Sequence, residues 1–196
     1  MPAVLFEASG FTARQLELAQ VPMMQNLFER NPEYFLVVNG AVPGPDEALN
    51  EFNEIPPPHL SYSEQWCIGI FTPEQRLAGV ATVVSDLGAI GVWHTGLFLL
   101  ATYLHGLGHG ASLYRALEAW AQTRGAQWMR LGVVKGNVKG ERFWEKMNFT
   151  AVRSRTAADA SGHINDVRVM VKPMGRGSLE EYFSLAPRDD PSSELL

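Results

Sequence analysis

The spacing of hydrophobic positions predicts two helices in the second half of the chain. In the first, apolar residues recur at i, i+3, i+4, i+7 and i+8, the core-facing stripe of a helix: Leu113, Ala116, Leu117, Trp120 and Ala121. Gly125 follows where a left-handed residue commonly ends a helix. The second helix starts after Asn137, which can cap it, and buries Phe143, Trp144 and Met147. Asn148 comes next and can also adopt a left-handed conformation.

Helix signals in the first sixty residues come mainly from proline. One helix opens at Val21-Pro22, with proline in its first turn, and ends before Asn31-Pro32. A shorter helix follows Pro45-Asp46 and ends before the three prolines at 56–58. The stretch at 39–46, NGAVPGPD, is expected to be a loop.

Apolar runs bounded by turn residues predict the strands, at residues 11–18, 65–71, 76–84, 91–100, 128–134, 151–155 and 167–171. The resulting order, β-α-α-β-β-β-α-β-α-β-β, lacks the regular alternation of a doubly wound fold. It favours an α+β fold with a mixed, mostly antiparallel sheet and one crossover through the helix around residues 113–121. After Pro173 the chain is rich in glycine, serine and charge, so residues 175–196 are expected to form a C-terminal tail of uncertain order.

Composition narrows the class of protein. The chain has 196 residues, is 46% hydrophobic and carries a net charge of −5, which suits one globular domain and disfavours nucleic acid as a partner. Cys67 is the only cysteine, so an intramolecular disulfide is excluded and no metal site is expected. The start of the chain lacks a signal-peptide pattern, and the longest apolar run is too short to span a bilayer. We therefore expect a cytoplasmic protein that does not associate with membranes.

Residues 105–110 read HGLGHG and lead directly into the first of the two helices. A glycine-rich loop at a helix N-terminus presents free backbone N–H groups to an anion, above all a phosphate, although glycines can also simply shape a tight turn. A nucleotide P-loop would need a lysine before Ser112. A dinucleotide-binding loop would need wider glycine spacing and a carboxylate about 20 residues on. Neither pattern is present.

A pyrophosphate loop for coenzyme A (CoA) is the third interpretation. Residues 98–149, FLLATYLHGLGHGASLYRALEAWAQTRGAQWMRLGVVKGNVKGERFWEKMNF, resemble the GNAT superfamily of acyl-CoA-dependent N-acyltransferases. That family carries Arg/Gln-x-x-Gly-x-Gly/Ala between its fourth strand and third helix, in register with His105 to Gly110. Its second block, a strand, an asparagine and a helix ending in an aromatic run, matches residues 133–149. The resemblance implies a GNAT-like fold over residues 1–174, with helices on both faces of the sheet.

The resemblance also implies which residues meet acetyl-CoA, the expected co-substrate. They are Leu99, Leu100, His105, Gly106, Leu107, Gly108, His109, Gly110, Ala111, Asn137, Phe143 and Trp144. The backbone N–H near Leu99 or Leu100 would polarise the thioester carbonyl. His105 stands at the Arg/Gln position and can donate only one hydrogen bond when neutral. Many members have a tyrosine, thought to protonate the leaving thiolate, where this chain has Trp144. Because an indole N–H is not an acid near neutrality, Trp144 is expected to pack along the pantetheine arm.

Direct transfer to an amine requires a base or a water chain, because the amine is protonated at neutral pH. His94, on the strand at 91–100, is the first candidate for this base; the alternative is a strand histidine bonded to a neighbour. Asp86 is the second, although an aspartate after a strand is usually a turn residue. By family register, the amine pocket would involve Phe28, Tyr34, Phe35 and the segment near His163.

The function expected is therefore an N-acetyltransferase that moves an acetyl group from acetyl-CoA directly to a primary amine of a small molecule or peptide. The alternative is a non-catalytic CoA-binding sensor or interaction domain. The departures from the family pattern at His105 and Trp144 favour this alternative. A homodimer paired through edge strands is left open by analogy with the fold.

Overall fold

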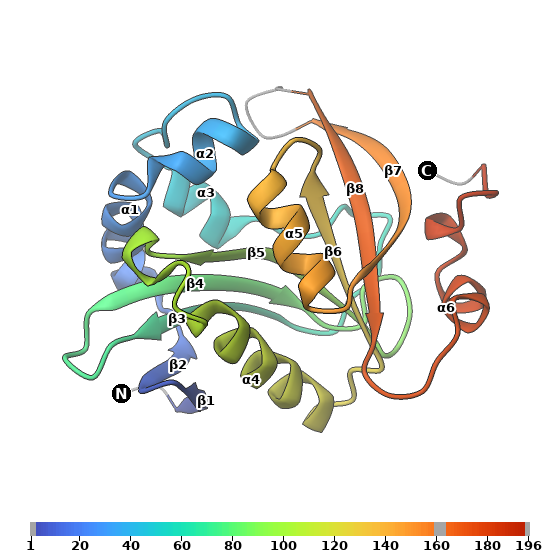
Figure 1. The fold of residues 1–196 in the computed structure, drawn as a ribbon, viewed down its shortest axis with the longest axis horizontal. Coiled ribbons are helices and arrows are strands. Elements are labelled where there is room, and N and C mark those ends of the chain that lie inside the picture. The colour runs from blue at the N-terminus through green and yellow to red at the C-terminus, as the bar shows by residue number, and fades with distance from the viewer. Residues whose placement is uncertain (1–2, 159–163, 195–196) are drawn as a thin grey trace.

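The computed structural model describes residues 3–158 and 164–194, and its centre is one eight-stranded sheet (Figure 1). The strand order is β1-β2-β3-β4-β5-β6-β8-β7. The strands are Val4–Ala8 (β1), Phe11–Gln15 (β2), Gln65–Phe71 (β3), Leu77–Val84 (β4), Val92–Leu100 (β5), Trp128–Val134 (β6), Thr150–Ala158 (β7) and Ile164–Pro173 (β8). Every neighbouring pair is antiparallel except β5 and β6, which are parallel.

Helices cover both faces of this sheet. Those of four or more residues are Val21–Glu29 (α1), Pro32–Val38 (α2), Glu47–Asn53 (α3), His109–Thr123 (α4), Val138–Lys146 (α5) and Leu179–Leu185 (α6). Figure 1 shows α4 and α5 on the near side of the sheet, with α6 beside β8. The helices α1 to α3 pack on the opposite face of the strands from α4, and α6 packs on that same opposite face farther along the sheet. The α+β fold with a mostly antiparallel sheet and helices on both faces is thus confirmed.

Several local predictions are confirmed by the backbone. β3 and β6 have the predicted bounds. The Asn137 side chain caps α5 by accepting a hydrogen bond of 3.0 Å from the Gly140 N–H. Gly125 and Asn148 are left-handed, with φ of +100° and +66°, at the ends of α4 and α5.

Other elements differ from the prediction. β1 pairs with β2 through a turn at Ser9 and Gly10, and both turn residues have positive φ. The first predicted strand is therefore the second of a hairpin, and it ends earlier, at Gln15. Pro32 starts α2 where only the end of a helix was expected, because proline is well tolerated in a first helical turn. β7 and β8 also extend farther than predicted, toward the loop between them.

Residues 175–194, named here the C-terminal segment, pack on the sheet through a buried ion pair. Ser178 caps α6 and, with Glu181, forms a capping box. Asp189 is completely buried, and it accepts hydrogen bonds from Arg130 Nε at 2.7 Å and from the Tyr182 hydroxyl at 2.6 Å. Burial alone would raise the pKa of Asp189, but the hydrogen bonds and charge of Arg130 lower it to about 2. A buried carboxylate paired in this way stays ionised and fixes the segment to β6.

Candidate active site

β5 and β6 separate halfway along their length and leave a gap inside the sheet. Their parallel pairing ends at Thr95 and Leu131, whereas β5 continues to Leu100 and β6 continues to Val134. Both strands keep their other neighbours beyond this point, β4 and β8. The backbone on both sides of the gap is therefore held in place by hydrogen bonds to β4 and to β8.

A β-bulge in β5 marks where the gap begins. Thr82 of β4 is opposite Leu97, and Val83 is opposite Thr95, so Gly96 is the extra residue. The Leu97 N–H donates to the Thr82 hydroxyl oxygen at 2.8 Å. A Cβ atom on Gly96 would lie 2.8 Å from the same oxygen, so only glycine fits without a shift of the threonine.

Backbone groups of β5 point into the gap. The Ala101 N–H donates to the Ala78 carbonyl of the β4 side at 2.8 Å. Because successive residues of a strand turn their backbone groups to opposite sides, the N–H groups of Phe98 and Leu100 point toward the gap. Of the two amides expected to polarise a thioester, the Leu100 amide is therefore on the gap side, and the Leu99 amide is on the β4 side. Phe98 is an additional donor that the family register did not suggest.

The glycine loop lies at the end of β5 and opens α4. Gly106 and Gly108 have φ of +76° and +81°, and no atom lies within 4 Å of a Cβ placed on either. The first backbone bond of the helix runs from the Ser112 N–H to the Gly108 carbonyl. Among the described residues, no backbone acceptor is found for the N–H groups from Gly106 to Ala111. This row of free donors at the positive end of α4 fits an anion such as a pyrophosphate.

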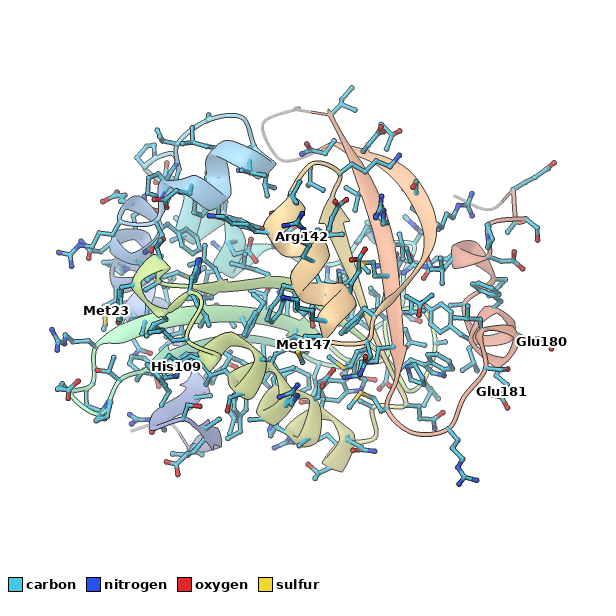
Figure 2. All side chains as sticks on the ribbon, viewed as in Figure 1. Met23, His109, Arg142, Met147, Glu180 and Glu181 are labelled. Atoms are coloured by element: carbon cyan, nitrogen blue, oxygen red, sulfur yellow. The ribbon has the colours of Figure 1, made fainter. Side chains whose placement is uncertain are left out.

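The two histidines of the loop direct their rings elsewhere. His105 Nε2 donates to the Leu100 carbonyl at 3.0 Å, so this N–H is not available to a phosphate in this rotamer. His109, labelled in Figure 2, is the first residue of α4, and its ring packs edge-on against Phe11 at 5.4 Å between centroids. His109 can still offer its backbone N–H group to a ligand.

The two α5 residues expected to contact acetyl-CoA, Phe143 and Trp144, lie in different surroundings. The Phe143 ring stacks parallel to the Phe98 ring at 6.1 Å and lies 3.4 Å from a Cβ placed on Gly110, so it joins β5 to the start of α4. Trp144 is 8% exposed and packs edge-on against Tyr114 at 4.7 Å, within the aromatic core. Phe143 thus lies between β5 and the start of α4, and the Trp144 ring packs edge-on against it at 4.8 Å.

Of the three residues expected in the amine pocket, two are core residues and one is partly exposed. Phe28 and Phe35 are buried in the core and pack on each other at 4.9 Å, because α1 and α2 turn these rings toward the sheet. That expectation is corrected for both. Tyr34 is half-buried, and burial together with the charges of nearby glutamates raises its pKa. His163 lies outside the described residues.

The two residues proposed as the base have other partners. Asp86 has a left-handed backbone, and its carboxylate accepts a hydrogen bond of 2.7 Å from the Gly91 N–H, so it stabilises the turn before β5. His94 Nδ1 accepts a hydrogen bond of 3.2 Å from Arg130. Burial and the positive charges of Arg130 and Arg188 lower the pKa of His94 to about 3. A ring whose acceptor nitrogen is occupied and whose basicity is this low is poorly suited to take a proton from an amine.

Glu51 on α3 is a site residue that the hydrophobic pattern gives no reason to select. Its carboxylate accepts a hydrogen bond of 2.9 Å from the Thr82 hydroxyl, the group that also holds the β5 bulge. Burial and the charge of Glu54 raise the pKa of Glu51 to about 7, against a smaller lowering by the Thr82 hydrogen bond. The only signal in the sequence is the i, i+4, i+7 spacing of Glu47, Glu51 and Glu54, which puts three carboxylates on one helix face.

Two further observations concern the described part of the chain. Residues 3–158 and 164–194 contain no group of three or more His, Cys, Asp or Glu side chains placed to hold a metal ion. Over the same ranges, no helix is both long and apolar enough to cross a bilayer.

Comparisons with known proteins agree with this geometry. The model of the acetyltransferase (GNAT) family matches residues 21–149. A comparison with curated protein sequences finds no match. An acetyltransferase from Thermus thermophilus has a similar structure, with a TM-score of 0.61 and 18% identity over 88% of this chain and 99% of the other.

Two further solved structures have the same fold. Spermidine N-acetyltransferase from Vibrio cholerae, in complex with CoA and spermine, has a TM-score of 0.62 and 16% identity over 89% of this chain and 99% of its own. The ribosomal-protein-S18-alanine N-acetyltransferase from Escherichia coli has a TM-score of 0.59 and 16% identity over 86% and 96%. The chain therefore belongs to the GNAT acetyltransferase family and is an acyl-CoA-dependent N-acyltransferase.

Proposed function

We propose that the protein transfers an acetyl group from acetyl-CoA directly to a primary amine of a small molecule or peptide. The observation that carries this proposal is the opening of the sheet between β5 and β6, with the free N–H groups of the glycine loop at its mouth. A pyrophosphate at Gly106 to Ala111 leaves the pantetheine arm to enter the gap beside Phe143. The thioester then lies beside β5 beyond the Gly96 bulge, where one of the two amides that face the gap, that of Phe98 or that of Leu100, polarises its carbonyl.

Thermal unfolding in the presence of acetyl-CoA, CoA, NAD and ATP, each at about 1 mM, tests the ligand class. A ligand at about 100 times its Kd stabilises the protein by about 2.7 kcal/mol, which is a shift in midpoint of about 5–10 °C for a domain of this size. We expect that shift with acetyl-CoA and CoA only. A larger shift with NAD or ATP would contradict the assignment of the loop.

A panel of primary amines then tests transfer, with release of the CoA thiol followed by a thiol-reactive dye. Cys67, the only cysteine of the chain, is buried, so the folded protein adds little background. Acetylated product must appear in step with free thiol, as mass spectrometry can verify. Thiol release without an acetylated amine would mean hydrolysis and would count against amine transfer.

A further inference from the structure

Next to the bulge, the sheet is exposed to solvent on the face that carries α3. Gly96 of β5 and Gly132 of β6 are exposed although both lie on inner strands of the sheet. They are on the same face as Thr82, as the pairing registers of β4, β5, β6 and β8 show. An acceptor amine can therefore approach the bulge from this face, opposite to α4 and α5.

Glu51 borders this opening. Its Oε1 accepts a hydrogen bond from Thr82 Oγ1 at 2.9 Å, and Thr82 Oγ1 accepts one from the Leu97 N–H at 2.8 Å. One threonine hydroxyl thus joins the carboxylate to the backbone of the bulge. Glu51 is half-buried, and among the described residues its carboxylate has no hydrogen bond other than that from Thr82, so its second oxygen can accept another donor.

The surroundings of Glu51 oppose its ionisation, and among the described residues no cation is found to act on it. Within the described chain, the titratable groups that interact with it are Glu47 of α3, Glu54 directly after α3, Tyr34 of α2 and Cys67 of β3. All of these become negative when they ionise. An ammonium group that entered the opening would place a positive charge beside this carboxylate, and proton transfer between the two would remove both charges.

We propose that Glu51 is the catalytic base that takes the proton from the ammonium group of the acceptor, with Thr82 as the residue that positions it against the bulge. This inference rests on the proposed function. The ammonium N–H bond breaks and its proton goes to a Glu51 oxygen, which later releases it to solvent. The nitrogen lone pair then forms the bond to the thioester carbonyl carbon. The C–S bond breaks, and the sulfur keeps the electron pair and takes the second nitrogen proton, which leaves an amide and free CoA thiol.

The test compares Glu51→Gln with the wild type on the amine that turns over fastest in the panel. Glutamine has the same size and still accepts the Thr82 hydrogen bond, so only the basic oxygen is lost. We expect kcat/KM near pH 7 to fall by about 100-fold or more, while the shift in melting temperature with CoA is unchanged. Glu29→Gln is the matched control, because Glu29 is exposed on α1 and bonds only to Gln25 in the described chain. Its activity should equal that of the wild type.

The pH profile and the basicity of the amine separate a base from a structural residue. The Glu51→Gln defect should shrink toward pH 10, where an alkyl amine loses its own proton. It should also shrink for a weakly basic amine that is already neutral near pH 7. Glu51→Asp keeps a carboxylate and should retain intermediate activity, and it carries the test if the glutamine variant does not fold. Thr82→Val should lower kcat more than it changes KM.

The outcomes separate this inference from the proposed function. Wild-type rates and a wild-type pH profile in an active Glu51→Gln enzyme would overturn the role of Glu51 and leave the acetyltransferase assignment intact. A defect of the same size with neutral and protonated amines would also overturn it. Failure of the wild type to acetylate any amine, despite binding acetyl-CoA, would overturn both.

Discussion

Replacement of Asp189 by asparagine is expected to lower the free energy of unfolding by about 3–5 kcal/mol. The variant keeps the volume of the side chain but leaves Arg130, which is 8% exposed, without its ionic partner. It also weakens the hydrogen bond that the Tyr182 hydroxyl donates to the carboxylate. Thermal or denaturant unfolding measures the loss, which corresponds to roughly 10 °C in melting temperature for a chain of this length.

The pH dependence of the free energy of unfolding is a second measurement of the contribution of Asp189. The pKa of Asp189 is depressed to about 2 in the folded protein, below its ordinary value of 3.8. The carboxylate therefore contributes its full stabilisation above about pH 4 and loses it as the pH falls through 2. The variant lacks this dependence. Asp190→Asn is the control, because the Asp190 carboxylate accepts hydrogen bonds from Ser192 in a local turn, and it should unfold close to the wild type. Equal stabilities of the two variants would refute the role given to the buried ion pair.

Replacement of Gly108 by valine is expected to weaken CoA binding by about 100-fold or more. Gly108 has φ of +81°, a conformation that is strained for a β-branched residue, so the loop must shift to accept the side chain. The shift would misalign the free N–H groups at the start of α4. Loss of two hydrogen bonds to a charged ligand, each worth about 1.5–3 kcal/mol, gives this factor. Calorimetric titration with CoA measures it.

Gly125→Val is the matched control at the other end of the same helix. Gly125 also has a positive φ, +100°, and likewise no atom within 4 Å of a Cβ placed on it. The two variants should lose similar amounts of stability through backbone strain, but only the Gly108 variant should lose CoA affinity. If both bind CoA as the wild type does, the glycine loop is not the phosphate site.

The sequence predicts best where one physical rule acts over a few residues. The apolar stripe of α4 and the cap at Asn137 depend on neighbours within one or two helical turns, and the structure has both. The short helix α2 was missed because its first residue, Pro32, is equally consistent with the end of a helix. Local patterns cannot decide between these interpretations without the packing of Phe35 against the core.

The residues that the sequence could not place are those whose partners are far along the chain. Arg130 and Asp189 are 59 positions apart, and Glu51 and Thr82 are 31 apart. A lone strand arginine and an aspartate in a polar segment both look like surface residues until the fold buries them together. His94 illustrates the converse, because a histidine on a strand near the expected site is a reasonable candidate base until Arg130 is found beside it.

Because β5 and β6 separate, the sheet has unpaired backbone groups in its interior. A sheet normally exposes such backbone at its two outer edges, where another polypeptide can add as an extra strand. This sheet has a further pair of edges in its interior, along Leu97–Leu100 and the end of β6. Aromatic side chains of α4 and α5 pack against Phe98 on one face of this opening. A slender molecule with amide groups of its own has the donors and acceptors needed to pair with these interior edges.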